Sequence, residues 1–83
     1  MNTMELIQQR LQDLEPESIE IQDDSAQHRG HAGATAGGGH YHLFLQAASL
    51  NALGRVAAHR AIYQRVQDLI PLPIHALQIT LLS

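Results

Sequence analysis

Histidines are concentrated in one stretch of the chain, HRGHAGATAGGGHYH (His28–His42), in a sequence that has no cysteine and no lysine. Imidazole nitrogens bind zinc, copper, nickel and iron, so this stretch is a candidate metal site. Two histidines three residues apart in a loop, such as His28 and His31, are nevertheless a much weaker metal signal than paired CxxC motifs. Taken alone, two such loop histidines are more often solvated than bound to a metal. The metal-site hypothesis therefore needs His75, a histidine that lies outside this stretch.

Two other chemistries fit the same residues less well. A phosphate-binding loop needs the pattern GxxxxGK[ST], and this chain has no lysine to reach the phosphates. The glycines also lead into an expected strand, so they offer no helix N-terminus to an anion. Ser25 or Thr35 with a histidine could imitate the nucleophile and base of a hydrolase, but the sequence indicates neither an ordering acid nor an oxyanion hole. We therefore do not expect an enzyme.

Length and charge narrow the class of protein further. The 83 residues are enough for one domain, which we expect to span residues 1–83. The formal net charge is −3 with neutral histidines, whereas nucleic-acid-binding proteins usually carry a basic excess. The chain contains neither a long apolar run nor the pattern of a signal peptide. We expect a cytoplasmic protein that does not bind membranes.

The spacing of hydrophobic residues predicts five elements in the order helix, strand, strand, helix, strand. Their expected ranges are Met4–Leu14, Ser18–Gln22, His40–Gln46, Arg55–Leu69 and His75–Leu82. Three strands with two helices on one face make a small α+β sandwich. The first two strands would form an antiparallel hairpin, and the helical crossover would make the third strand parallel to the second.

This topology predicts where the histidines lie. The hairpin loop and the starts of the last two strands lie at the same end of the sheet. His28, His31, His40 and His75 would therefore gather at one rim of the sheet. His59, near the beginning of the second helix, would lie away from this rim.

Alternation and helical spacing predict which side chains face the core. In the last strand, His75 is expected on the same face as the apolar residues of Leu77–Leu81. His59 is expected to be a hydrogen-bonded core histidine on the buried side of the second helix, and His42 a partly exposed strand residue.

Several short motifs together resemble the BolA family. In that family the corresponding stretches read like DES-x-x-H, HF, RHR-x-[IV]Y and [IV]HAL-x-[IL]. The matching stretches here are DDSAQH (Asp23–His28), GHAG (Gly30–Gly33), HY (His40–Tyr41), HRAIY (His59–Tyr63) and IHALQI (Ile74–Ile79). Each motif is weak alone, but they follow one another in the family's order and spacing, and the resemblance extends from about Met4 to Leu81. The sequence departs from the family pattern at Leu50–Ala52 and at Ala58.

The resemblance implies a fold similar to the class II KH domain, and a function. Members of the family bind monothiol glutaredoxins and share a [2Fe–2S] cluster with them and with glutathione, in cluster trafficking or in iron and stress regulation. The resemblance assigns the two metal-ligand roles to His28 and His75. The remaining ligands would be sulfurs from the glutaredoxin cysteine and from glutathione. Whether His31 or His40 replaces His28 stays open.

Two alternative functions remain. Some family members are described as transcriptional regulators, and a KH-like fold could bind nucleic acid. The KH clamp is a GxxG loop between helices, however, whereas Gly30–Gly33 lies between expected strands. The second alternative is a mononuclear zinc, copper or nickel site built from His28, His31 and His40.

Overall fold

Three strands, β1 (Ser18–Asp23), β2 (Gly39–Gln46) and β3 (Ile74–Leu82), form one sheet in the order β1-β2-β3. The computed structural model describes residues 1–28 and 38–83, with the backbone alone for Gln27 and His28. β1 pairs with β2 in antiparallel orientation, and β2 pairs with β3 in parallel orientation. The predicted mixed three-stranded topology is therefore confirmed.

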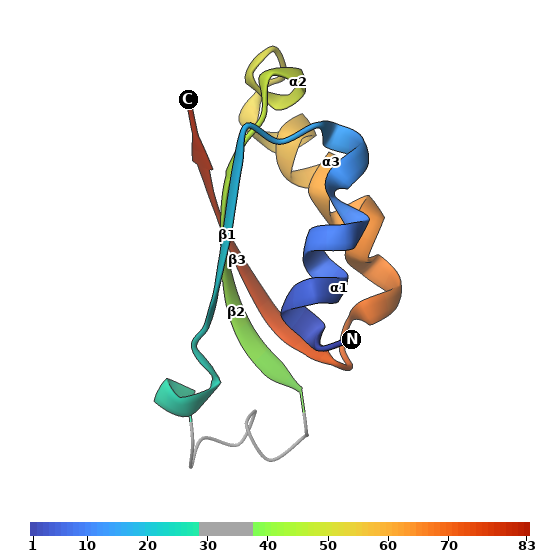
Figure 1. Cartoon of the computed structure of the whole chain (residues 1–83), viewed down its shortest axis with the longest axis vertical. Helices are drawn as coiled ribbons and strands as arrows, with labels where there is room; N and C mark the ends of the chain where they lie inside the picture. The colour runs from blue at the N-terminus through green and yellow to red at the C-terminus, as the bar shows by residue number, and fades with distance from the viewer. Residues whose placement is uncertain (29–37) are drawn as a thin grey trace.

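Both long helices lie on the same face of this sheet (Figure 1). Each predicted helix is an α-helix that tightens into a 3-10 turn at its end. The helical elements are α1 (Thr3–Arg10), η1 (Gln12–Leu14), η2 (Ser25–His28), α2 (Ala48–Asn51), α3 (Arg55–Val66) and η4 (Gln67–Leu69). None of the helices in the described part of the chain has the length and hydrophobicity needed to cross a bilayer.

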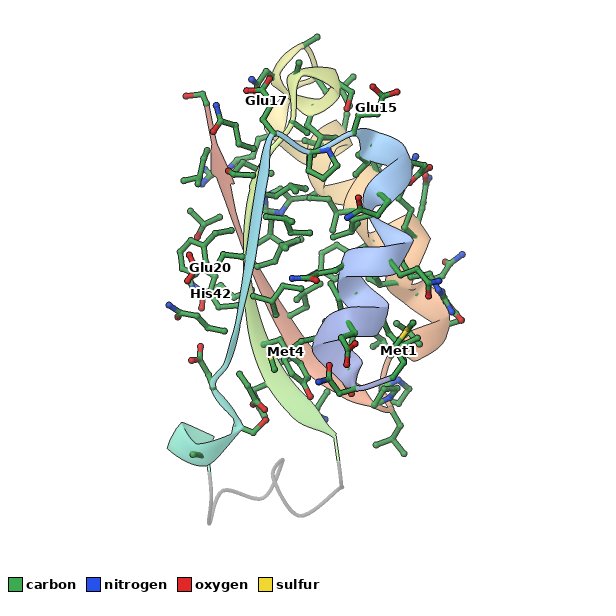
Figure 2. All side chains as sticks on the ribbon, viewed as in Figure 1. Met1, Met4, Glu15, Glu17, Glu20 and His42 are labelled. Carbon is green, nitrogen blue, oxygen red and sulfur yellow. The ribbon has the colours of Figure 1, made fainter. Side chains whose placement is uncertain are left out.

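The hydrophobic core lies between the two helices and the inner face of the sheet. The largest side chains with almost no solvent exposure are Ile7, Leu11, Leu43, Leu45, Ile62, Val66 and Ile74. Figure 2 shows Glu20 and His42 on the opposite face of the sheet, turned away from the helices. The fold is therefore a two-layer sandwich whose outer sheet face carries polar side chains such as Glu20 and His42.

Two ion pairs join the helical segments to each other. Nη2 of Arg10 donates to Oδ2 of Asp68 at 2.9 Å, and Nε of Arg65 donates to Oδ1 of Asp13 at 2.8 Å. The hydrogen bonds from these guanidinium groups hold the pKa of Asp68 and the pKa of Asp13 below the ordinary carboxyl value. The helices are thus tied at their exposed surface as well as through the core.

Candidate functional site

His75 is the extra residue of an irregularity in the pairing of β2 and β3. Gly39 pairs with Ile74, and the next residue of β2, His40, pairs with Ala76. A bulge of this kind turns a side chain to a direction that regular alternation would not give it. Ile74 is 0% exposed and takes the core-facing position, whereas His75 is exposed. The prediction that His75 shares a face with Leu77–Leu81 was therefore wrong.

A glycine lets the beginning of β2 pack closely against His75. A Cβ atom on Gly38 would lie 2.6 Å from Cβ of His75 and 2.8 Å from the carbonyl oxygen of Pro71. The N–H of Gly39 donates to the carbonyl oxygen of Pro73 at 2.9 Å. The backbone of the glycine pair thus lies against the segment that enters β3.

The rings of His40 and His75 lie side by side at the start of the two parallel strands. Their centroids are 5.1 Å apart and their planes are tilted by 49°. His40 is half-buried, whereas His75 is exposed to approach from outside. The predicted proximity of these two histidines is confirmed, and their role as ligands stays a prediction.

Hydrogen bonds attach the segment that ends in His28 to the backbone of His40. Oγ of Ser25 accepts the N–H of His40 at 3.0 Å, and the N–H of Asp24 donates to the carbonyl oxygen of His40 at 2.7 Å. The N–H of Ser25 donates to Oδ1 of Asp23 at 3.0 Å. The hydroxyl and the amide of Ser25 lower the pKa of Asp23. Ser25, weighed above as a nucleophile, is here the acceptor that anchors η2, whose last residue is His28.

Two of the histidine predictions fall outside what the structure describes. The side chain of His28 and the whole of His31 lie outside the described residues, as does Gly30–Gly33. Among the described residues, no group of three or more histidine, cysteine, aspartate or glutamate side chains is placed to hold a metal ion. The paired imidazoles of His40 and His75 are therefore the part of the candidate site that the structure provides.

The other two histidines make different contacts. Nε2 of His42 lies 2.7 Å from Oγ1 of Thr80, and its ring stacks on Phe44 with centroids 4.0 Å apart. His42 is half-buried, as predicted for a strand residue. His59 lines a hollow beside the second half of β3, so its predicted separation from the rim is confirmed. The prediction that it is a core histidine was wrong, because His59 is only half-buried.

Two positions at which the sequence departs from the motif pattern are core residues. Leu50 is 3% exposed and Ala58 is 1% exposed, and both belong to the cluster between helices and sheet. These departures therefore supply packing rather than a surface contact. Sequence reasoning missed the positioning roles of Ser25 and Gly38, for which the available signals were the DDS triplet and the run of glycines.

A family model described as "BolA-like protein" matches residues 11–83. A curated relative, "SufE-like protein 1, chloroplastic/mitochondrial" of Arabidopsis thaliana, is 33% identical over 72 residues. The match covers 81% of this chain and 19% of that protein. The chain therefore spans about a fifth of the length of this relative.

Three solved structures are similar to nearly the whole chain. BolA1 from Arabidopsis thaliana is 28% identical with a TM-score of 0.81, and the match covers 98% of this chain and 90% of that one. The BolA domain of SufE1 from Arabidopsis thaliana is 29% identical with a TM-score of 0.79, over 98% and 92% of the two chains. A bol-like protein from Babesia bovis shares the fold at 16% identity, with a TM-score of 0.73, over 99% and 85%.

Proposed function

The chain belongs to the BolA-like family, and from this premise we propose that it is a non-enzymatic adaptor for a monothiol glutaredoxin. In this proposal the two proteins form a heterodimer that shares a glutathione-containing [2Fe–2S] cluster. The observation that carries the proposal is the pair of adjacent imidazoles of His40 and His75 at the rim of the sheet. The cellular role would be cluster trafficking or iron, redox and stress regulation.

The donor atoms of this chain fit a shared cluster. A [2Fe–2S] cluster takes four ligands, which are usually thiolates, and this chain has no cysteine. It can therefore contribute no thiolate, and in this proposal it contributes imidazole nitrogens, while the thiolates come from the partner cysteine and from glutathione. When bound, the cluster would supply a redox centre whose potential the neutral imidazoles raise above that of an all-thiolate cluster.

The exposure of His75 supports its role as the ligand that meets a partner. The bulge holds this side chain outside the core, while the half-buried His40 lies against it. We propose His28 as the second ligand, because η2 is anchored to His40 through Ser25. His40 is the alternative second ligand, because its ring already lies beside that of His75. Ligation requires neutral imidazoles, so the heterodimeric complex should weaken in acid.

Reconstitution tests the proposal directly. The protein is mixed with a monothiol glutaredoxin, glutathione, ferrous iron and sulfide, and the visible circular dichroism is compared with that of the glutaredoxin homodimer. We expect a different spectrum, which His75→Ala and His28→Ala abolish and His59→Ala preserves. Loss in His40→Ala but not in His28→Ala would assign the second ligand to His40. A spectrum identical to that of the homodimer would contradict the proposal.

A further inference from the structure

A hollow of about 310 Å³ lies between α3 and the second half of β3. Its lining consists of Arg55, His59, Ile79, Thr80 and Leu81. The hollow starts four residues beyond His75, which corresponds to about 13 Å along an extended strand. The lining of the hollow does not include His75, so the hollow is a separate feature from the histidine rim.

The floor of this hollow includes the outer edge of the sheet. β3 is the last strand in the order β1-β2-β3, and no strand of the described residues pairs with its outer edge. The hydroxyl of Tyr63 donates to the carbonyl oxygen of Leu77 at 2.6 Å, so this carbonyl points away from β2. Alternate residues of a strand direct their backbone groups to the same edge. The N–H and C=O groups of Ile79 and Leu81 therefore also face outward.

Arg55 carries the positive charge in the lining of the hollow. Arg55 is exposed and His59 is half-buried, and these bases are the ionisable residues of the lining. The other lining residues are Ile79, Thr80 and Leu81, so the described residues that line the hollow include no carboxylate to neutralise the guanidinium. An occupant that brings a carboxylate to the helix side of the β3 edge would complement this surface.

We propose that the outer edge of β3 binds an extended, acidic peptide segment of a partner protein. The segment would add a strand beside Ile79 and Leu81, using main-chain hydrogen bonds for affinity. Its carboxylate side chains would face α3, where Arg55 and His59 lie. Exposed strand edges are ready templates for such pairing, and the hollow leaves room for side chains of the added strand.

A second copy of this chain is a poorer occupant, although its β1 is also an acidic edge strand. In β1 the apolar side chains of Ile19 and Ile21 are packed against the chain's own core. Glu20 projects from the outer face of the sheet, away from the side on which the helices lie (Figure 2). The carboxylate of Asp23 is engaged by the amide of Ser25. Antiparallel pairing of β1 with β3 of another copy, with the helices of both copies on one face of the joined sheet, would therefore not bring these acids to Arg55.

Peptide titration of the whole isotope-labelled protein tests the proposal by NMR. The probe is a blocked hexapeptide that alternates threonine and glutamate. We expect shifts centred on the amides of Ile79 and Leu81. The same peptide with glutamine in place of glutamate should bind more weakly. A version N-methylated at alternate residues should not bind, because it lacks the donors that pair with the strand edge.

Two matched variants separate the hollow from general charge attraction. Arg55→Gln should weaken binding of the threonine–glutamate peptide about two- to fivefold, as expected for an exposed ion pair. Arg60→Gln removes an exposed arginine of the same helix outside the hollow and should leave binding unchanged. Equal weakening by both variants, or undiminished binding of the N-methylated peptide, would overturn the proposal. So would concentration-dependent dimerisation that protects the same amides without peptide.

Discussion

The imidazole rings of His40 and His75 lie with their centroids 5.1 Å apart, although the two residues belong to different strands. Parallel pairing places the starts of β2 and β3 at the same end of the sheet, which is the rim described above. The irregularity at Gly39/His40 then releases His75 from the core-facing position, which Ile74 occupies instead. The candidate site therefore depends on how the glycine run meets the beginning of β3.

Substitution of Gly38 should disturb this arrangement. A Cβ atom there would lie 2.9 Å from the backbone nitrogen of His75 and closer still to its Cβ. Because these neighbours are backbone or Cβ atoms, they cannot move away cheaply. We expect Gly38→Ser to lower the free energy of unfolding by about 1–3 kcal/mol, typical of overpacking. The amide signals of His75 and Ala76 should shift in NMR spectra.

Gly54→Ser is the matched control for this substitution. A Cβ atom on Gly54 meets nothing within 4 Å, and serine is a favoured residue at the helix N-cap that Gly54 occupies. Urea unfolding should show unchanged or slightly increased stability. Equal destabilisation by both serines would refute the role given to the Gly38–His75 contact.

Removing the hydroxyl of Ser25 should loosen η2. Ser25→Ala leaves the N–H of His40 without this acceptor, so stability should fall by about 1 kcal/mol. The hydroxyl is the main cause of the lowered pKa of Asp23, so that pKa should rise toward the ordinary value. NMR titration of the Asp23 carboxyl measures this change. Ser25→Thr retains the hydroxyl and should preserve the lowered pKa, and a result identical to alanine would contradict the assignment.

Acid should weaken the junction between the helices. The pKa values of Asp13 and Asp68 are lowered in the folded state, chiefly by hydrogen bonds from Arg65 and Arg10. Such groups contribute stability above the ordinary carboxyl pKa of about 4, and this contribution is lost as the pH falls through the lowered values. Urea midpoints measured between pH 7 and pH 3 should therefore decrease in the native protein.

A double variant isolates the share of the two ion pairs in this pH dependence. Asp13→Asn combined with Asp68→Asn should reduce stability at neutral pH and flatten the loss in acid. Glu17→Gln removes an exposed carboxylate that takes part in neither ion pair and should leave the pH profile unchanged. Parallel profiles for the native protein and the double variant would show that the two pairs contribute nothing.

Much of the fold could be predicted from the sequence because its signals are local and periodic. The stripe that includes Ile7 and Leu11 defines one helix, and both residues are fully buried. The alternation around Leu43 and Leu45 defines the central strand. The segment between the last two strands is helical, which favoured a parallel crossover, and the sheet has that topology.

The direction of His75 could not be predicted in this way. A regular alternation of period two places it with Leu77, and only the pairing with β2 reveals the extra residue. That pairing depends on the close approach of Gly38, a tertiary contact without a periodic signal. The anchoring role of Ser25 likewise depends on the backbone of His40, which is distant in sequence.

Pulsed EPR spectroscopy of the reduced heterodimer tests ligation by this chain most directly. The protein is labelled with ¹⁵N-histidine and combined with an unlabelled monothiol glutaredoxin, glutathione, iron and sulfide. We predict hyperfine couplings from two ¹⁵N imidazoles, one of which disappears in His75→Ala, while His59→Ala retains both. A cluster spectrum without ¹⁵N coupling, in a complex that contains both proteins, would contradict the account.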